Sequence, residues 1–306
     1  MKFGKLHGPD ELAEVDFSLP SISSASIDLL TSKAPEQPFM AYVGCPMWAN
    51  KEWVGKLYPP KTPQKEFLSL YSRAFNGIEL NSTHYRVPSS DTLDRWREAS
   101  PEGFLFSPKV PQPISHRLSN SLDQDQIDHF CEAMLQLGNR LGCSFLQLPP
   151  TFGVRQFPQL QSLLATWPTY VPLAIEFRHE SWFQHNRLLS MVTEFLIDYQ
   201  VATVITDVGG RRDVLHLDLT APTAMIRFVG NGLVPSDYER VDAWIPILQQ
   251  WIEAGLEQLY FFVHEPDDTF APEMGRYVIQ EFVDKLRIPL SLPEFIPTEG
   301  EQMNLF

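Results

Sequence analysis

Eight short apolar segments recur along the chain, separated by longer amphipathic stretches. Segments that are apolar on both faces are typical of strands in a parallel sheet that is buried on both sides. They lie at residues 39–44, 77–80, 104–106, 144–148, 173–177, 201–205, 224–229 and 259–263. The sequence therefore predicts eight parallel strands, each followed by a helix or a loop.

Helix signals lie between the predicted strands. Asp123 with Gln126, and Ser236 with Glu239, have the spacing of a capping box ahead of an apolar stripe. Pro246 lies inside the second of these helices and predicts a kink or a late start there. Alternating strands and helices are typical of an α/β fold.

The predicted architecture is a (β/α)8 TIM-type barrel, with some irregularity allowed. An open dinucleotide-binding sheet is less favoured, because residues 43–48 after the first strand contain one glycine and a proline instead of a glycine-rich fingerprint. We expect the barrel domain at residues 39–287. Residues 1–38 are predicted to form an N-terminal extension, and residues 288–306 an extended C-terminal tail.

The charge balance, the cysteines and the apolar runs argue against certain partners, sites and locations. The 306 residues include 24 Lys and Arg against 38 Asp and Glu, a formal net charge of −14. This charge disfavours a polyanion as partner unless a local basic cleft exists. Cys45, Cys131 and Cys143 lack the spacing of a disulfide framework or a zinc site. Acidic residues interrupt the first 20 positions, and no apolar run approaches the ~18 residues that a membrane span needs, so we expect a cytoplasmic protein without a membrane segment.

Polar residues end most of the predicted strands. In a parallel barrel these ends meet at one mouth, where active sites lie. Residues two apart on a strand leave it on the same side, as Glu79 with Asn81 and Glu176 with Arg178 would. The other strand-end residues are Lys109, Gln147, Asp207, Arg227, His264 and Glu265.

Carboxylates and cations together suit a small anionic or polyhydroxylated ligand. An arginine can clamp an anion with two hydrogen bonds while a carboxylate acts as base. We predict Glu79, Glu176, Lys109 and Asp207 as catalytic residues. The alternative is that some of them form structural ion pairs, and Asp207, just before two glycines, also suits a turn. As an expectation, Glu176→Gln removes ligand binding and leaves the fold intact.

A divalent metal is the less favoured alternative. Glu176, Asp207, His264 and Glu265 are ligand types that metal-dependent barrels use. The nearby cations would repel a metal ion, and no local pair of histidines with ligand spacing is present. We therefore expect no metal or other cofactor.

Aromatic residues follow several predicted strands. Trp48, Tyr85 and Trp182 would lie near the mouth and could stack on a sugar or a base. The alternative is that such side chains pack helices onto strands, which is favoured for Trp96 because it lies three residues from Leu93.

Several long motifs resemble the YecE-like family, domain of unknown function 72. They span residues 78–88, 104–111, 147–150 and 176–183, and the resemblance covers about residues 40–287. It implies a TIM-type barrel of unestablished activity, described as related to sugar isomerases and also as similar to the endonuclease IV type. The motif residues are Glu79, Asn81, Thr83, Tyr85, Lys109, His116, Gln147, Glu176, Arg178, His179 and Trp182. The last third departs from the pattern: residues 227–230 read Arg-Phe-Val-Gly where the family tends to have Arg-Leu-His-Gly, and His264-Glu265 replace paired asparagines.

The leading hypothesis is an enzyme that acts on a small polar, sugar-like or phosphorylated substrate by carboxylate acid/base chemistry. The predicted substrate-binding residues are Asn81, Tyr85, His116, Gln147, Arg178, His179, Arg227, Trp48 and Trp182. The alternative is a nucleic-acid-associated protein, either a repair enzyme of the endonuclease IV type or a binding module, whose mouth receives a flipped nucleotide.

The C-terminal tail carries a short partner motif. Three prolines between residues 288 and 297 predict an extended tether. Gln302, Met303, Leu305 and Phe306 resemble the peptide by which bacterial repair proteins dock on the DNA sliding clamp, with a glutamine amide and apolar anchors. The alternative is that Leu305 and Phe306 pack on the protein's own surface.

Overall fold

The eight predicted strands are confirmed. A computed structural model describes residues 4, 6, 8–118 and 122–297 of the chain. The eight strands are β1 (Met40–Gly44), β2 (Gly77–Leu80), β3 (Leu105–Pro108), β4 (Ser144–Gln147), β5 (Leu173–Glu176), β8 (Ala202–Val208), β9 (Thr223–Val229) and β10 (Gln258–His264). Two further short strands, β6 (Phe183–Gln184) and β7 (Arg187–Leu188), form a small antiparallel pair.

The eight strands run parallel and follow one another around the molecule, but their ladder is not closed. Six of them form one sheet in the order β1-β10-β9-β8-β5-β4, and β2 pairs with β3 separately. Only isolated bridges join the β3 region to β4 among the described residues, for example Lys109 to Phe145. The structure therefore shows an α/β fold with a mostly parallel sheet, and the closed TIM-type barrel is not confirmed.

Side chains take the place of backbone pairing between β1 and β2. The Asn76 amide accepts a hydrogen bond from the Val43 N–H at 2.9 Å and donates one to the Ala41 carbonyl at 2.7 Å. The Tyr71 hydroxyl accepts from the Cys45 N–H and donates to the Gly77 carbonyl at 3.0 Å. These bonds satisfy strand-edge groups that would otherwise be buried without partners.

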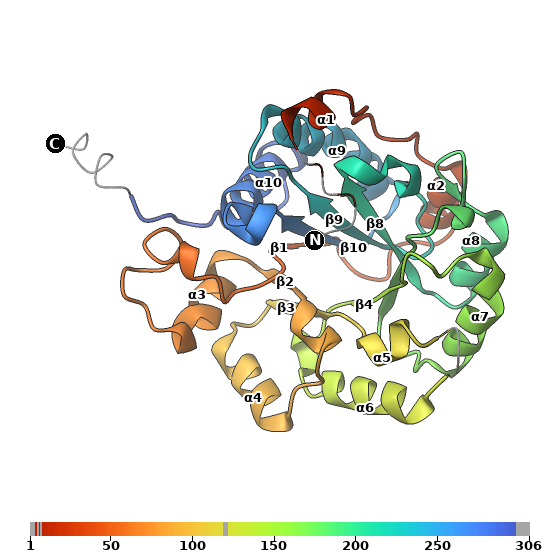
Figure 1. The fold of residues 1–306 in the computed structure, drawn as a ribbon, viewed down its shortest axis with the longest axis horizontal. Helices are drawn as coiled ribbons and strands as arrows, with labels where there is room; N and C mark the ends of the chain where they lie inside the picture. The colour runs from red at the N-terminus through yellow and green to blue at the C-terminus, as the bar shows by residue number, and fades with distance from the viewer. Residues whose placement is uncertain (1–3, 5, 7, 119–121, 298–306) are drawn as a thin grey trace.

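Helices surround the strands on the outside (Figure 1). They are α3 (Phe67–Ala74), α4 (Ser90–Ala99), α5 (Gln112–Ser115), α6 (Gln124–Leu135), α7 (Phe157–Thr166), α8 (Ser190–Asp198), α9 (Pro235–Ala254) and α10 (Ala271–Leu286). Short 3-10 helices lie at Lys51–Trp53, Gln64–Glu66, Asn81–His84, Gly138–Arg140, Val154–Gln156, Glu180–Trp182, Gly209–Val214 and Pro266–Asp268. Among the described residues, no helix is both long and apolar enough to cross a bilayer.

The capping predictions had mixed outcomes. Asp123 caps α6 as predicted, since its carboxylate accepts from the Gln126 N–H at 3.2 Å. Ser236 does not cap α9, which begins at Pro235. Asp237 binds the preceding loop instead, accepting from the Asn231 N–H at 2.8 Å. The helix begins at Pro235 and continues through Pro246, so of the two predicted alternatives, a kink or a late start, the late start does not occur.

The N-terminal extension packs on the body of the fold. It contains α1 (Pro9–Ala13) and α2 (Ser24–Thr31). The Ser26 hydroxyl accepts from the Leu219 N–H at 2.9 Å. The Phe17 ring lies 5.1 Å from the guanidinium carbon of Arg240. These contacts attach the described part of residues 4–38 to the body of the fold.

Residues 288–297 contain no helix or strand, as the prolines predict. They leave α10 and pass the loop after β1, where the Ile296 N–H donates to the Lys56 carbonyl at 2.8 Å (Figure 1). The partner motif at Gln302, Met303, Leu305 and Phe306 lies outside the described residues.

Candidate functional site

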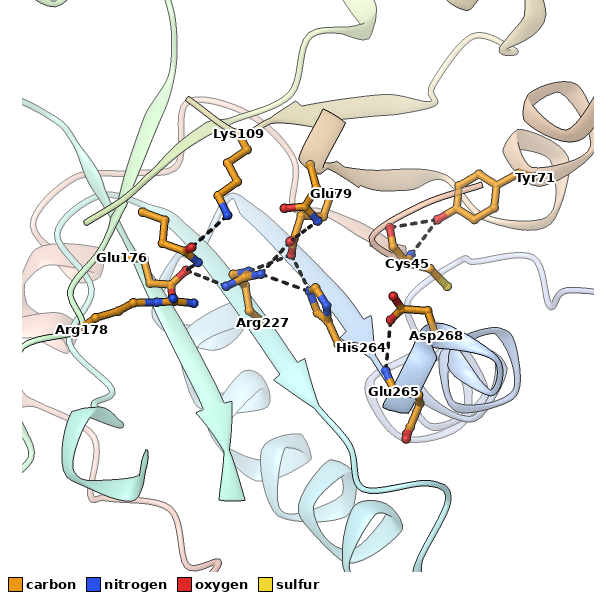
Figure 2. Close-up of polar contacts among 12 residues, drawn as sticks. Cys45, Tyr71, Glu79, Lys109, Glu176, Arg178, Arg227, His264, Glu265 and Asp268 are labelled. Carbon is orange, nitrogen blue, oxygen red and sulfur yellow. Dashed lines mark hydrogen bonds and ion pairs between the residues drawn. The ribbon is translucent and has the colours of Figure 1, made fainter. Parts of the chain in front are cut away.

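Arg227 on β9 lies at the centre of a buried charge cluster. Its Nε and Nη2 donate to the two carboxylate oxygens of Glu79 at 2.8 and 2.7 Å. Its Nη1 donates to Glu176 at 2.7 Å, and all three side chains are at most 1% exposed (Figure 2). Two carboxylates from opposite sides therefore hold one guanidinium by three charge-assisted hydrogen bonds.

Further polar side chains extend the cluster on the Glu176 side. Glu176 also accepts from Arg178 Nε at 2.6 Å and from the Gln147 amide at 2.8 Å. The other end of the Gln147 amide accepts from Lys109 Nζ at 2.9 Å (Figure 2). Side chains at the ends of β3, β4 and β5 thus meet Arg227 of β9 in one network.

On the opposite side, Glu79 binds two more groups. The Asn81 amide donates to its Oε1 at 2.8 Å, and His264 Nε2 lies 2.8 Å from its Oε2. No other partner of the His264 ring is present among the described residues except Arg227, at 3.4 Å from the same nitrogen. Glu79 therefore orients the imidazole and leaves its Nδ1 atom available.

Strand register explains why these residues meet. Gln147 is the register partner of Glu176, and Thr206 is the partner of Arg227, so all four point to the inside of the strand ring. His264 lies two residues after Phe262, the partner of Arg227, and points the same way. Below them, the Phe145 ring lies 5.5 Å from the guanidinium carbon of Arg227, so the polar layer rests on an apolar one.

The two carboxylates are held ionised. Burial raises the pKa of Glu79, but Arg227 and His264 outweigh it and bring the pKa well below its usual value. Burial likewise opposes ionisation of Glu176, but Arg178 and Arg227 lower its pKa to about 2. Both groups are therefore weak bases at neutral pH.

The pKa values of the nearby nitrogen bases are also lowered, which in their case favours the neutral form. Burial, followed by the charge of Arg227, lowers the pKa of Lys109 to about 8. Burial lowers the pKa of His84 to about 4, although its Nδ1 lies 2.9 Å from the Val110 carbonyl. Burial, then Lys109, also lowers the pKa of His116. At neutral pH, His84 and His116 are therefore neutral, and the Lys109 ammonium loses its proton more readily than that of an ordinary lysine.

A cavity of about 560 Å³ opens above this cluster. Its lining residues are Pro46, Met47, Asn81, Tyr85, Lys109, Gln147, Pro150, Arg178, Arg227, His264 and Asp268. Tyr85 lies at its rim and is 80% exposed. Three of these side chains, Lys109, Arg178 and Arg227, are cations, and they face three carboxylates, Asp268 on the wall and the buried Glu79 and Glu176 beneath it. Because Glu79 and Glu176 are already bonded to the arginines, the side of the cavity with Arg178 and Lys109 is where an anionic group of a small ligand would fit.

The structure brings most of the predicted residues together and places others elsewhere. Glu79, Asn81, Tyr85, Lys109, Gln147, Glu176, Arg178 and Arg227 line or support the cavity. His116 does not line it, but its ring lies 5.4 Å from that of His84. Trp48 packs against Trp96, and Trp182 is fully buried with its Nε1 donating to the Phe152 carbonyl. His179 accepts from the Ser181 N–H and lines a separate pocket.

The prediction that Asp207 lies in the mouth is wrong. Asp207 follows the inward-pointing Thr206, so its side chain leaves β8 toward α9. There it accepts from Arg240 at 2.8 Å and from Trp244 Nε1 at 2.9 Å, and it also pairs with Arg212. Asp207 is fully buried in a structural ion-pair network.

The side chains that the sequence offered for a metal are separated. The Glu265 side chain points away from the charge cluster (Figure 2) and accepts from the Gly232 N–H at 2.8 Å, while Asp207 pairs with Arg240. Both carboxylate oxygens of Glu176 already accept hydrogen bonds from nitrogen donors. Within the described ranges, no three His, Cys, Asp or Glu side chains are grouped as metal ligands would be.

Comparison with known proteins places the chain in a family. A profile described as "Protein of unknown function DUF72" matches residues 42–297. The chain belongs to the DUF72 family. It is 30% identical over 287 residues to the UPF0759 protein YecE of Escherichia coli K12, covering 87% of this chain and all of YecE. It is also 27% identical over 154 residues to the UPF0759 protein YunF of Bacillus subtilis 168, covering 47% of this chain and 52% of YunF.

Two solved DUF72 structures share the fold. A DUF72 protein of Enterococcus faecalis V583 superposes with a TM-score of 0.63 at 19% identity, covering 80% of this chain and 98% of the other. One from Thermotoga maritima MSB8 gives a TM-score of 0.63 at 23% identity, covering 80% and 99%. These comparisons establish the family and the fold.

His264 lines the cavity of this DUF72 member, although the sequence placed it only among the strand-end residues and possible metal ligands and not among the catalytic or substrate-binding residues. The signal was available, because His264 ends an apolar strand and is in phase with Phe262. Its register partner is Val229, the position at which the resemblance leads one to expect a histidine. An imidazole at 264 thus enters the mouth from the neighbouring strand.

Proposed function

We propose that this DUF72 protein is an enzyme that acts on a small, polar, sugar-like substrate carrying an anionic group, on an irregular (β/α)8 barrel. The observation that carries the proposal is the cavity above the Glu79–Arg227–Glu176 cluster, with cations on its wall and His264 held by Glu79. Arg178 would bind the anionic group of the substrate, Lys109 would contact the substrate next to that group, and Tyr85 and Asn81 would bind its hydroxyl groups.

Proton transfer in this proposal belongs to His264. The low pKa values of Glu79 and Glu176 make either carboxylate a poor direct base. Glu79 instead accepts from His264 Nε2, which fixes the ring and leaves Nδ1 to take or give a proton. Arg227 keeps both carboxylates ionised and would stabilise negative charge that develops on the substrate.

Ligand titration tests this proposal. Ribose 5-phosphate, ribose and inorganic phosphate would be titrated into the full-length protein by calorimetry. We expect the sugar phosphate to bind more tightly than the neutral sugar, and Arg178→Gln to weaken its binding by about tenfold or more. The exposed Arg95 on α4 provides the matched control, since Arg95→Gln should change nothing.

The role proposed for His264 is tested separately, by measuring substrate turnover as well as binding. His264→Asn should keep sugar-phosphate binding within about threefold while abolishing any turnover of a bound substrate. Equal affinity for ribose and ribose 5-phosphate, or unchanged binding in Arg178→Gln, would refute the anion site.

As a second candidate, we propose recruitment to the DNA sliding clamp through the C-terminal peptide. The favouring observation is the sequence Gln302-Met303-Asn304-Leu305-Phe306 after an extended segment that leaves α10. An endonuclease IV type of activity is not proposed, because Asp207 and Glu265 bind within the protein away from the cavity.

A peptide of residues 297–306 should bind the sliding clamp weakly. Deleting Leu305 and Phe306 from the full-length protein should remove clamp binding and leave the melting temperature unchanged. The same peptide with Leu305 and Phe306 replaced by alanine is the control. Absence of binding at high peptide concentration would exclude this candidate.

A further inference from the structure

Lys109 is bonded differently from the other cations of the mouth. Arg227 forms ion pairs with Glu79 and Glu176, and Arg178 forms one with Glu176 among its contacts. Within the described part of the chain, Lys109 forms no ion pair, and its Nζ has one hydrogen bond, to the neutral amide oxygen of Gln147 at 2.9 Å. Two of its three donor positions are thus unused by the described side chains.

The backbone of Lys109 is fixed so that the side chain is directed into the cavity. Its N–H donates to the Leu80 carbonyl at 3.2 Å, and its carbonyl accepts from Thr83 Oγ1 at 2.7 Å. The side chain passes the Phe145 ring, with Nζ 5.9 Å from the ring centroid, and lines the cavity while only 8% of the residue is exposed. The amine is therefore preorganised, and a ligand in the cavity can reach it.

The surroundings favour the free amine. Burial and the charges of Arg227 and Arg178 lower the pKa of Lys109 to about 8, against the opposing charges of Glu176 and Glu79. The nearby His84 and His116 have lowered pKa values and add no fixed charge. At neutral pH, Lys109 would hold about 300-fold more free amine than an ordinary lysine.

We propose that Lys109 is a covalent nucleophile that forms an imine with the carbonyl carbon of a small anionic substrate. This inference rests on the proposed function, because it needs the anion site to bring the carbonyl to Nζ. The substrate class is a carbonyl compound whose carboxylate or phosphate group binds near Arg178. An open-chain sugar phosphate and a keto acid share this chemistry.

The reaction is balanced without an added oxidant or reductant. The Nζ lone pair forms the C–N bond, and the carbonyl π electrons move to oxygen, which takes a proton from the nitrogen. The C–O bond then breaks, and the oxygen leaves as water with the second proton of the amine. Carbonyl and amine thus give imine and one water.

Reductive trapping tests this proposal. The full-length protein would be incubated at neutral pH with pyruvate, dihydroxyacetone phosphate or neutral dihydroxyacetone, each with sodium cyanoborohydride. Intact-mass and peptide mass spectrometry would then locate the adducts. We expect one reduced adduct per chain, on Lys109, formed about tenfold or more faster than on the exposed Lys51. Pyruvate and dihydroxyacetone phosphate distinguish a carboxylate from a phosphate as the anchoring group.

Matched variants separate this inference from the proposed function. Lys109→Arg keeps the positive charge and should abolish the adduct, while Lys51→Arg should not change it. Adducts spread evenly over surface lysines, or equal labelling in Lys109→Arg, would overturn the covalent role. If wild-type protein forms no adduct but still binds ribose 5-phosphate through Arg178, the covalent step fails and the anion site stands.

Discussion

Arg227 shows how the desolvation of a buried cation can be offset by its partners. Its desolvation is offset only because Glu79 and Glu176 supply three charge-assisted hydrogen bonds. Glu79 also forms hydrogen bonds with Asn81 and His264. Glu176 also accepts hydrogen bonds from Arg178 and Gln147. Such a cluster fixes side-chain positions in the mouth, and removing one member leaves a buried charge uncompensated.

Glu176→Gln should lower the free energy of unfolding by about 3–5 kcal/mol, since Arg227 would lose an ionised partner inside the protein. The variant is still expected to keep its fold, and the complete burial of Glu176 adds that it should do so with lower stability. Chemical denaturation measures the effect. Asp94→Asn, at an exposed pair with Arg97, should change stability by about 0.5 kcal/mol or less, and equal effects of the two variants would contradict the argument.

Glu265 makes stability depend on pH in the opposite direction from Glu176. Burial, followed by the charge of Asp237, raises the pKa of Glu265 to about 8. Because the folded-state pKa is raised, its contribution to stability is fully present below the unfolded pKa of about 4.5 and is lost as pH rises through 8. Glu265→Gln keeps a neutral side chain at every pH.

This variant should therefore match the wild type near pH 4 and exceed its unfolding free energy by roughly 2–4 kcal/mol above pH 8. Urea denaturation across this pH range measures the difference. The exposed Glu98 on α4 is the control position, and Glu98→Gln should show no such trend. A constant difference between Glu265→Gln and wild type at all pH values would be evidence against a raised pKa.

At the scale of single elements, strand periodicity was the most informative part of the sequence. The period of two correctly placed Glu176 beside Arg178, and parallel strand ends correctly gathered Glu79 and Arg227. Asp207 was misplaced because β8 continues to Val208, beyond the predicted end at 205, and inward and outward positions alternate along it. An apolar run shows where a strand lies, but its register depends on contacts from outside the segment.

The backbone conformation at the end of α10 lowers the stability of the protein, and this effect can be tested. Arg287 ends α10 in the left-handed conformation, with φ 59°, and is exposed. Arg287→Gly should raise the free energy of unfolding by about 0.5–1 kcal/mol, because glycine adopts this conformation without steric strain. Lys285→Gly, two residues earlier and inside the helix, should lower it by about 1 kcal/mol. Thermal and chemical denaturation of both variants measure the difference, and destabilisation by Arg287→Gly would refute the explanation.

At the scale of the molecule, two features could not be predicted from the sequence. Between β1 and β2, the side chains of Asn76 and Tyr71 form hydrogen bonds with backbone groups that would otherwise pair strand to strand. Hydrogen bonds of this kind leave no periodic pattern in the sequence. The backbones approach so closely here that a Cβ atom at Gly44 would lie 1.9 Å from the Gly77 carbonyl oxygen. The position of the N-terminal extension depends likewise on contacts between residues about 190 positions apart.

The extension contributes to a buried charge network on the far side of β8 from the mouth. The carbonyl oxygens of Phe17 and Ser18 each accept from Arg212 at 3.0 Å, and the Phe17 ring lies over both Arg212 and Arg240. These two arginines hold the buried Asp207. The extension therefore shields an ion pair from water, and the strength of that pair depends on the shielding.

Phe17→Ala should lower the free energy of unfolding by about 1–2 kcal/mol, because it removes two cation–π contacts and admits water to the Asp207 pairs. It should also increase amide hydrogen exchange in residues 207–214 and leave ligand binding in the mouth unchanged, since the Asp207 side chain points away from the cavity. Asp28→Asn, on the exposed face of α2, is the matched control and should affect neither quantity. If Phe17→Ala left both stability and exchange in 207–214 unchanged, the extension would be an appendage that the fold does not need.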